Sequence, residues 1–370
     1  MNMSMRLVFP NSLRLKYKIR KRPSMEVCSH NHLDPNTVLL KINGTACNLH
    51  CRYCSEIVKK KDIRMSLEYI HNIFERLPAD TSIILHGGEP LLDAHFIDEL
   101  IHLFRDYRTG KLSIQTNGCF SKEMLLVLLN NRKYIKLGIS LDGPSEHSCY
   151  RAFPNGRASF NCVNSLLDEL CEYDFDVKCI ATIHSLNHKD PNRFMEYFLS
   201  KKNVTQLRIN PCFDVSQQGL ADYSITPSQF FVFLREIFYL WLNKSLFQKI
   251  RIDPIHAAFE HVLSGEHTSN RNCHRFVSIY PQNLCTLCDS FGDMSFICDD
   301  WKNLFFQAEL YSKAKLFDQC SHCIESSACD LGCIAILKRF QPWPWLVDDY
   351  CRYRRNFFSL IRQTNFDFSG

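Results

Sequence analysis

The stretch that decides the fold runs over residues 47–54 and reads Cys47-Asn48-Leu49-His50-Cys51-Arg52-Tyr53-Cys54. Its three cysteines are spaced C-x3-C-x2-C and follow directly on a strand-like run over residues 38–43. A tetrahedral zinc site takes four protein ligands, usually from two CxxC-type pairs. A cubane iron–sulfur cluster takes one thiolate per iron, so three thiolates leave one iron open for a small molecule. The spacing therefore favours an open, reactive cluster over a closed structural site.

The composition is that of an ordinary globular protein. The chain has 370 residues, of which 45% are hydrophobic and 22% charged, and its formal net charge is +5. This length suits one large domain and a smaller one. There is no apolar run long enough to span a bilayer and no secretory signal, and the cations are scattered apart from short basic runs at 16–22 and 59–61. We therefore expect a cytoplasmic protein that binds neither membrane nor nucleic acid.

The chain contains 19 cysteines, more than a reduced cytosolic enzyme needs for packing. A secreted disulfide framework is disfavoured by the odd count, the size of the chain and the missing signal peptide. Three cysteines lie at 47–54 and eight more lie between 285 and 351. The remaining eight are scattered, and we interpret them as small buried hydrophobic residues.

The middle of the chain alternates strand and helix patterns, which predicts a parallel α/β sheet. The expected strands are at 37–43, 81–86, 111–116, 135–141, 176–183 and 204–210. The expected helices are at 66–77, 93–107, 121–130, 159–173 and 190–202. Six strands suit a partial (β/α) barrel as well as an open doubly wound sheet, although no GxGxxG follows the first strand. Parallel folds present their chemistry at the carboxyl ends of the strands.

Polar turns follow three of these strands. They are His86-Gly87-Gly88-Glu89-Pro90, Thr116-Asn117-Gly118 and Ser140-Leu141-Asp142-Gly143-Pro144. Paired glycines let the backbone approach a ligand, and a carboxylate can bind an ammonium group. Each motif alone is typical of a turn. Three in succession, on the face where the cysteine loop emerges, favour a bound ligand.

Taken together, the cysteine spacing, the GGEP turn and the SLDGP turn resemble the radical S-adenosylmethionine (SAM) enzymes over residues 37–212. The resemblance implies a partial (β/α)6 TIM-like barrel in which Cys47, Cys51 and Cys54 bind a [4Fe–4S] cluster. SAM would chelate the open iron, and its reductive cleavage would give a 5′-deoxyadenosyl radical that abstracts hydrogen. The implied SAM contacts are Tyr53 near the adenine, Gly87, Gly88 and Glu89 at the amino group, Ser140 at the ribose or carboxylate, and Arg151, with Arg157 as its rival, at the carboxylate.

A second group of cysteines resembles the SPASM domain, a C-terminal extension with two auxiliary [4Fe–4S] clusters. It reads Cys320-x2-Cys323-x5-Cys329-x3-Cys333, followed after seventeen residues by Cys351. By that pattern one cluster takes Cys320, Cys323, Cys329 and Cys351, and the other takes Cys333 with Cys285, Cys288 and Cys298. Two cubanes need eight thiolates, whereas a zinc ribbon would use only four of those present. The upstream half departs from the family spacing, and Cys273 is a possible substitute ligand there.

These resemblances predict four parts and a class of substrate. The parts are an N-terminal segment (1–36), the barrel (37–212), bridging helices (213–272) and the SPASM domain (273–370). We expect an oxidoreductase with SAM and three [4Fe–4S] clusters, reduced by flavodoxin or ferredoxin, that acts on a peptide or protein. The first choice is a maturase that installs a C–C cyclophane or thioether crosslink in a ribosomally made peptide. The alternatives are a formylglycine-generating anaerobic sulfatase-maturating enzyme and a non-catalytic protein whose metals only stabilise its fold.

Overall fold

The computed structural model describes residues 7–8, 34–56, 63–264, 276–282, 284–287, 320, 322–325, 329, 332–364 and 366–367. Cys273, Cys288, Cys298 and most of the predicted N-terminal segment 1–36 lie outside the described residues.

A nine-stranded sheet organises the described part of the chain, in the order β10-β7-β6-β5-β4-β3-β2-β11-β12. Every neighbouring pair is parallel except β11 and β12. The strands are β2 (Thr37–Lys41), β3 (Ser82–His86), β4 (Leu112–Thr116), β5 (Ile135–Ser140), β6 (Val177–Ile183), β7 (Val204–Pro211), β10 (Arg251–Asp253), β11 (Phe276–Tyr280) and β12 (Leu284–Thr286).

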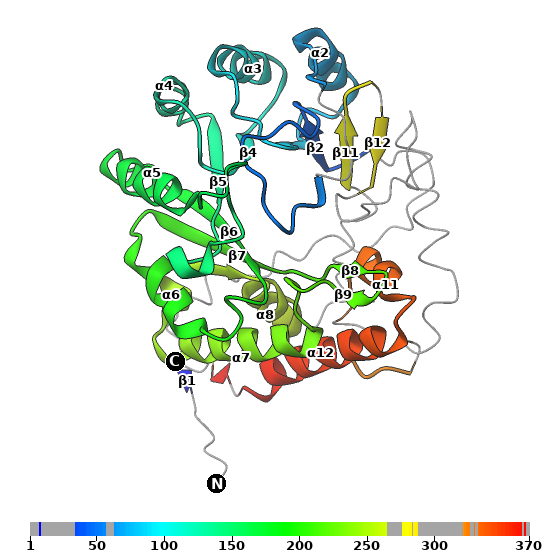
Figure 1. Cartoon of the computed structure of the whole chain (residues 1–370). Coiled ribbons are helices and arrows are strands. Elements are labelled where there is room, and N and C mark those ends of the chain that lie inside the picture. Colours follow the sequence, from blue (N-terminus) through cyan, green and yellow to red (C-terminus); the bar gives the residue numbers. More distant parts are fainter. Residues whose placement is uncertain are drawn as a thin grey trace.

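The strand order decides between the two folds that the sequence left open. Strands β2 to β7 lie side by side in chain order, with no reversal of the kind that defines a doubly wound sheet. Figure 1 shows the helices between them fanned around the outside of the curved sheet. These helices are α2 (Leu67–Arg76), α3 (Ala94–Tyr107), α4 (Lys122–Asn130), α5 (Phe160–Glu172) and α6 (Pro191–Ser200). The partial (β/α)6 barrel is confirmed, and each predicted strand and helix ends within two residues of the observed one.

Local sequence explains where these helices begin. Ser66, Asp93 and Ser121 accept hydrogen bonds from the backbone N–H three residues later, which satisfies a donor at the start of α2, α3 and α4. The apolar stripe of each helix then packs on the strands, and residues such as Ile97, Leu100 and Phe104 on α3 are buried. The helices cover the outer face of the sheet, and the predicted site residues lie in the loops at the carboxyl ends of the strands.

The sheet extends beyond the six predicted strands at both edges. Strand β11 pairs with β2, and β10 pairs with β7. Helices α7 (Pro227–Asn243) and α8 (Ile255–Ser264) follow the barrel, and α11 (Ile334–Phe340) and α12 (Pro344–Gln363) come near the end of the chain. Short pairings complete the structure, with β1 (Leu7–Val8) on β13 (Phe366–Asp367) and β8 (Val215–Ser216) on β9 (Gly219–Leu220).

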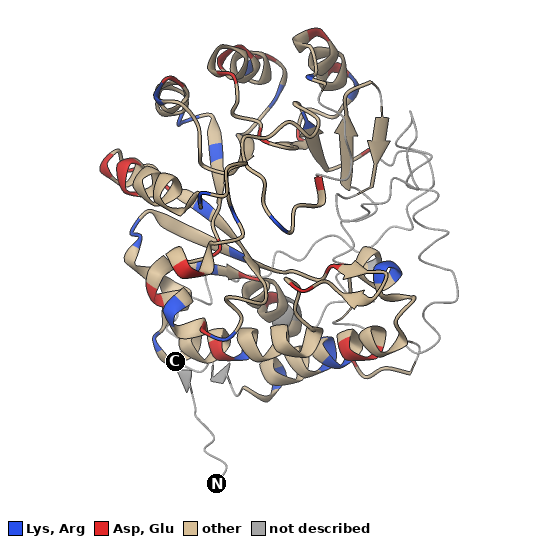
Figure 2. Cartoon of the chain, in the orientation of Figure 1, with Lys and Arg blue, Asp and Glu red and all other residues tan. Residues whose placement is uncertain are grey.

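The C-terminal helix α12 packs against α7 through aromatic side chains. Tyr353 on α12 lies 5.5 Å, centroid to centroid, from Phe230 on α7. Phe213, just after β7, contacts both Phe230 and Tyr350. Because these rings are buried, the described C-terminal residues share one apolar core with the barrel. Figure 2 shows acidic and basic residues interspersed along the helices. Among the described helices, none is both long enough and apolar enough to cross a membrane.

Candidate active site

The three-cysteine loop follows β2 at the carboxyl edge of the sheet. Two backbone hydrogen bonds flank Cys51, from His50 N–H to the Ala152 carbonyl (2.7 Å) and from Arg52 N–H to the Tyr150 carbonyl (3.0 Å). The loop is thereby paired with residues 150–152, which follow β5. Cys51 is buried, Cys54 is partly buried and Cys47 is exposed, and all three are free thiols.

A buried ion pair ties the end of this loop to the sheet. The ammonium of Lys41, at the end of β2, lies 2.9 Å from Glu56 Oε1 and 3.2 Å from His86 Nδ1. The Lys41 side chain is fully buried and that of Glu56 almost so. A lone charge in such a place would be costly, so the two residues stabilise each other. Neither was predicted, because Lys41 stands in a strand pattern and Glu56 in a loop.

Hydrogen-bond donors converge on the sulfur of Cys47. The backbone N–H of Leu49 lies 3.4 Å from Sγ and the side-chain amide of Asn117 lies 3.6 Å from it. Asn117 also donates to Asn48 Oδ1 at 2.7 Å, which holds the amide in place. Although the Cys47 residue is exposed overall, desolvation of its thiol by the surrounding chain raises its pKa to about 11. Burial also raises the pKa of Cys51, where the nearby Arg151 opposes the shift. Iron binding would therefore release protons from these thiols.

The two glycines of the GGEP turn pack closely against the backbone of residues 44–46. A Cβ on Gly88 would lie 2.0 Å from the Ala46 carbonyl oxygen, and one on Gly87 would lie 2.7 Å from that of Gly44. Gly88 and Glu89 donate backbone hydrogen bonds to those same two carbonyls. The turn is thus docked on the segment that leads into Cys47. This packing requires glycine whether or not a ligand is bound.

The carboxylate of Glu89 joins the ends of β3 and β4. Oε1 accepts from the Thr116 hydroxyl at 2.7 Å and from Leu91 N–H at 2.9 Å, and Oε2 accepts from Asn117 N–H at 2.7 Å. Burial raises its pKa to about 7, against these hydrogen bonds. A carboxylate oxygen has more than one acceptor position, so Oε2 can still receive an ammonium proton.

The predicted residues after β5 differ in their surroundings. Ser140, at the end of the strand, accepts a hydrogen bond from the Gln115 amide at 2.9 Å. Arg151 is buried, and its Nη1 donates to the Tyr53 hydroxyl at 3.1 Å. Its pKa is raised by the neighbouring Tyr53, Cys51 and Asp142, although burial opposes the shift. Arg157 is exposed and lies over the Phe153 ring, beside a pocket of about 320 Å³ that Cys162 also lines.

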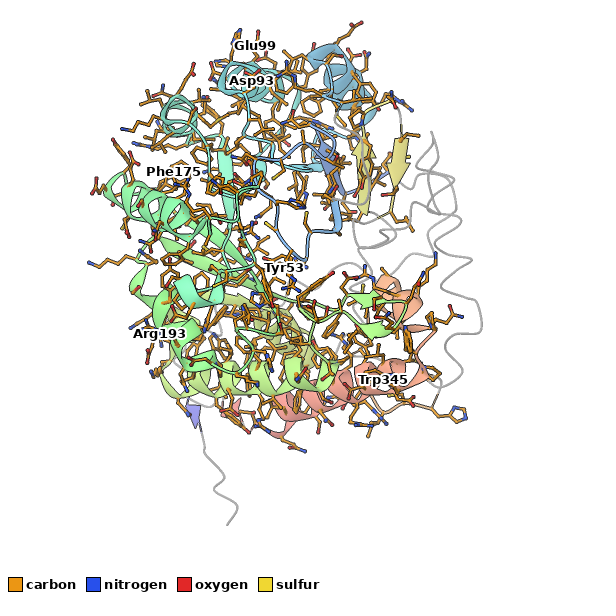
Figure 3. All side chains as sticks on the ribbon, viewed as in Figure 1. Tyr53, Asp93, Glu99, Phe175, Arg193 and Trp345 are labelled. Atoms are coloured by element: carbon orange, nitrogen blue, oxygen red, sulfur yellow. The ribbon has the colours of Figure 1, made fainter. Side chains whose placement is uncertain are left out.

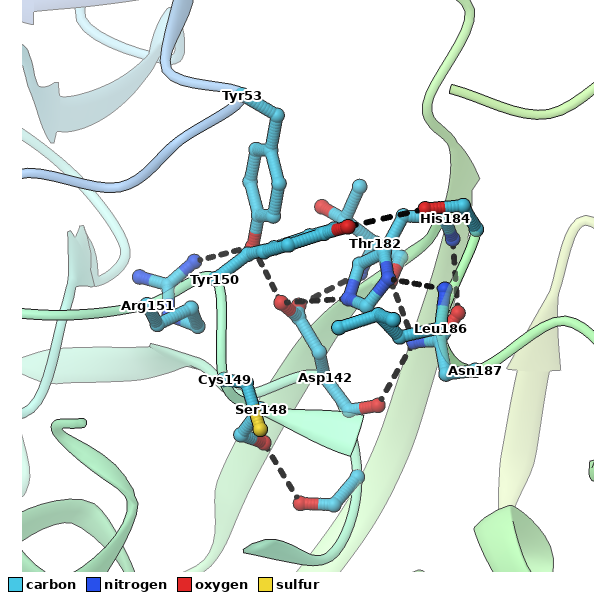
Figure 4. A network of polar contacts seen from close by, with 12 residues as sticks. Tyr53, Asp142, Ser148, Cys149, Tyr150, Arg151, Thr182, His184, Leu186 and Asn187 are labelled. Atoms are coloured by element: carbon cyan, nitrogen blue, oxygen red, sulfur yellow. Dashed lines mark hydrogen bonds and ion pairs between the residues drawn. The ribbon is translucent and has the colours of Figure 1, made fainter. Parts of the chain in front are cut away.

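Tyr53 also contacts a polar network formed by Asp142 and residues at the end of β6, which Figure 4 shows. The Tyr53 hydroxyl donates to Asp142 Oδ2, and Asp142 Oδ1 accepts from Thr182 N–H at 2.9 Å. His184 Nε2 lies 3.6 Å from Asp142 Oδ2, and both side chains are fully buried. The sequence pointed to Asp142 only as part of the SLDGP turn, whereas His184 was missed. Its position directly after the strand ending at Ile183 is the signal that could have found it.

Tyr53 also marks where this site lies in the molecule. Figure 3 shows it near the centre, between the upper helices of the barrel and the lower layer of helices, while Asp93, Glu99, Arg193 and Trp345 lie at the periphery. The structure thus brings Cys47, Cys51, Cys54, Tyr53, Glu89 and Arg151 into one connected region.

Four C-terminal cysteines, Cys323, Cys329, Cys333 and Cys351, lie on or near α12. Arg354 donates from Nε to Cys329 Sγ at 3.5 Å and from Nη2 to the Cys329 carbonyl at 3.2 Å. Burial raises the pKa of Cys351, and so do the nearby thiols of Cys329 and Cys323. Cys333 N–H donates to the Tyr350 hydroxyl. Cys285 is buried on β12.

Both groups of cysteines have N–H donors beside a sulfur atom. In the part of the chain that the structure describes, no three His, Cys, Asp or Glu side chains are grouped to hold one metal ion. A cubane instead places each thiolate on a different iron. The N–H donors to Cys47 and Cys329 are the kind that tune cluster sulfurs.

Comparisons with known proteins agree with this geometry. The Radical SAM superfamily model matches residues 43–198, which contain the cysteine loop, the GGEP turn and the SLDGP turn. Residues 43–198 form a radical SAM domain. The match supports SAM binding and implies an iron–sulfur cluster, in an α/β fold of the predicted kind.

The similarity extends well beyond this domain. A cysteine-type anaerobic sulfatase-maturating enzyme of Clostridium perfringens (strain 13 / Type A) is 27% identical over 363 residues, covering 88% of this chain and 96% of the relative. The solved structure of native anSMEcpe with bound AdoMet matches with a TM-score of 0.74 at 22% identity, over 89% of this chain and 99% of that one. Streptococcus suis SuiB bound to precursor peptide SuiA matches with a TM-score of 0.63 at 14% identity, over 83% of this chain and 73% of that one.

Proposed function

We propose that this chain is an anaerobic sulfatase-maturating enzyme that oxidises a cysteine or serine of a sulfatase to formylglycine. The observation that carries the proposal is the similarity to the Clostridium perfringens enzyme, which covers 88% of this chain and 96% of that relative. This span far exceeds the radical SAM domain at residues 43–198. The proposal reverses the order expected from sequence, which put peptide crosslinking first and formylglycine formation second.

In this proposal Cys47, Cys51 and Cys54 hold the [4Fe–4S] cluster that binds SAM. When bound, cluster and SAM supply a 5′-deoxyadenosyl radical. Glu89, with Gly87 and Gly88, faces the amino group, Tyr53 the adenine, and Ser140 the ribose or carboxylate. Arg151 is preferred over Arg157 as the carboxylate partner, because its guanidinium is buried beside Tyr53 while Arg157 is exposed.

Two auxiliary clusters would complete the redox chemistry. One takes Cys320, Cys323, Cys329 and Cys351, and the electrostatic contacts of Cys351 with Cys323 and Cys329 support that grouping. The other takes Cys333 with Cys285, Cys288 and Cys298. Fully ligated clusters suit the removal of one electron from a substrate radical. The electron donor would be reduced flavodoxin or ferredoxin in the cytoplasm.

The test is an anaerobic assay of the reconstituted protein with SAM, dithionite and a peptide that spans the modified cysteine of a sulfatase. We expect 5′-deoxyadenosine together with a peptide aldehyde that a hydrazide reagent traps. The matched control is the same peptide with alanine at the target position, which should give no aldehyde. SAM cleavage without any aldehyde, from both cysteine and serine peptides, would contradict the proposal.

Peptide crosslinking is the second candidate, and the fold shared with precursor-bound SuiB favours it. Its product would differ in composition, because a crosslink removes two hydrogens and keeps the sulfur, whereas formylglycine formation from cysteine removes the sulfur. Mass spectrometry of the product from the cysteine peptide therefore distinguishes crosslinking from formylglycine formation. A protein whose metals are only structural would give no 5′-deoxyadenosine after reduction.

A further inference from the structure

Asp142 lies beside the predicted SAM contacts Tyr53 and Arg151 but is not itself one of them. It is fully buried at the end of β5, next to the loop that carries the cysteines. Its carboxylate accepts from Thr182 N–H and from the Tyr53 hydroxyl, and its backbone carbonyl accepts from the Asn187 side chain at 3.2 Å. A buried carboxylate needs donors to be stable, and here one comes from the cysteine loop and the other from strand β6.

His184 faces the same carboxylate at a distance longer than a hydrogen bond. Its Nδ1 accepts a hydrogen bond from Leu186 N–H at 3.3 Å, so we assign the ring proton of the neutral imidazole to Nε2. That nitrogen faces Asp142 Oδ2 at 3.6 Å. Asn187 in turn accepts from His184 N–H at 2.7 Å and donates to the Thr182 carbonyl at 2.9 Å. The loop after β6 therefore holds the Asp142 backbone carbonyl and places the His184 ring beside the Asp142 carboxylate.

Tyr53 lies between two opposite charges. The Tyr53 hydroxyl donates a hydrogen bond to the Asp142 carboxylate, and Arg151 donates a hydrogen bond to the Tyr53 oxygen at 3.1 Å. Tyr53 directly precedes Cys54, and Arg151 lies in the segment whose backbone pairs with the loop on either side of Cys51. The hydroxyl thus joins the cysteine loop to the ends of β5 and β6 at one atom. Figure 4 shows this arrangement, with Tyr53 above Asp142 and Arg151 to one side.

We propose that Asp142 is a positioning residue for the SAM site, which acts through the Tyr53 hydroxyl to fix the cysteine loop and, together with Arg151, the adjacent SAM-binding surface. Residues that hold the ligands of a metal site typically change metal affinity or activity by about 10- to 100-fold when they are replaced. The proposal concerns the SAM site and is independent of which peptide is the substrate.

Two variants and a matched control test it in the reconstituted full-length protein without peptide. Asp142→Asn keeps the shape of the side chain and removes its charge, and Tyr53→Phe keeps the ring and removes the hydroxyl. The control is Tyr223→Phe, which removes another Tyr–Asp hydrogen bond, from Tyr223 to Asp214, outside the cysteine loop. Iron content and melting temperature are measured for all three variants.

We expect Asp142→Asn to raise the KM for SAM and slow its reductive cleavage by about 10- to 100-fold. The change in the EPR spectrum of the reduced cluster on SAM addition should also differ from wild type. Tyr53→Phe should act in the same direction but less, because the attraction between Asp142 and Arg151 remains. If both variants match Tyr223→Phe in KM and in spectrum, the proposal is wrong. Should Asp142→Asn lose its iron, Tyr53→Phe decides alone by the same criteria.

Discussion

The cysteine loop at 47–54 and the cysteines around α12 hold their thiols in different ways. In the first region the thiols belong to one short loop, and contacts from three neighbouring segments fix that loop. These are Lys41 with Glu56, Asn117 at Cys47, and residues 150–152, which contribute both their backbone and the Arg151 side chain at Tyr53. In the second region the thiols come from separate positions in the chain and meet beside one helix, where Arg354 contacts Cys329.

Under the proposed function, this difference corresponds to different roles for the two regions. An open cluster must present one iron to SAM in a fixed direction, so its loop benefits from positioning by many protein groups. A fully ligated cluster is held by its four thiolates and needs mainly a suitable charge environment. Changes in the first region should therefore affect SAM cleavage, and changes in the second should affect the later redox steps.

The largest expected effect is the loss of SAM cleavage in Cys51→Ala. Removing one of three thiolates leaves a cluster that cannot be held with a single open iron, so 5′-deoxyadenosine should fall to background. The measurement is 5′-deoxyadenosine by liquid chromatography after anaerobic reduction. Cys171→Ala is the control, because Cys171 lies on α5, away from both groups, and should retain activity. If Cys51→Ala cleaved SAM at the normal rate, the cysteine loop would not be part of the active site.

Cys320→Ala should separate the two regions most clearly. If the auxiliary clusters accept the electron from the substrate radical, SAM cleavage stays measurable while the modified peptide is lost. Both products are quantified in one reaction, with Cys51→Ala as the contrast that loses both. Unchanged yield of modified peptide from Cys320→Ala would refute the relay role.

Breaking the buried ion pair between Lys41 and Glu56 should destabilise the first region without changing any cysteine. Lys41→Met removes the ammonium that lies 2.9 Å from the buried Glu56 carboxylate, and breaking a buried ion pair in this way typically costs about 3–5 kcal/mol. Thermal unfolding of the reconstituted protein measures the loss. The double variant Lys41→Met with Glu56→Gln should recover much of it, since both charges of the pair are then removed. Equal stability of the single and double variants would contradict this account.

The architecture of the barrel was predictable because its causes are local. Hydrophobic periodicity and capping residues such as Ser66, Asp93 and Ser121 lie within a few positions of the elements they define. The cysteine spacing likewise places its three thiols in one loop without knowledge of the rest of the chain. The N-terminal boundary of each helix could therefore be predicted to within one residue.

The supporting residues of the site were not predictable in the same way. Lys41 and Glu56 are 15 residues apart and meet because the cysteine loop returns to the end of β2. Asp142 and His184 are about 40 residues apart and meet because the parallel neighbours β5 and β6 end side by side. The glycines show the other difficulty. Sequence indicated that Gly87 and Gly88 allow close approach, but the nearest neighbour of each is the backbone of residues 44–46.

Glu89 predicts a pH effect on the stability of the first region in the absence of SAM. Burial raises its pKa from 4.5 to about 7, so between these values the folded protein binds more protons than the unfolded chain. Stability then falls as pH rises through that window, by about 3 kcal/mol for this group. Chemical unfolding at pH 4.5 and 7 should show this fall relative to Glu89→Gln. The exposed Glu169→Gln should keep the wild-type pH profile; a Glu89→Gln profile parallel to wild type would contradict the prediction.

The smallest expected effect lies beside α12, where Arg354→Gln removes a positive charge and a donor from Cys329. Both losses disfavour the reduced, more negative cluster, so its midpoint potential should fall. A hydrogen bond of about 1 kcal/mol corresponds to roughly 40 mV for one electron. Redox titration followed by EPR measures the shift. Arg352→Gln, on the same helix but largely exposed, is the matched control and should leave the potential unchanged. Because the cysteine loop has its own supports, SAM cleavage by Arg354→Gln should equal wild type; a parallel loss of cleavage would show that the two regions are coupled.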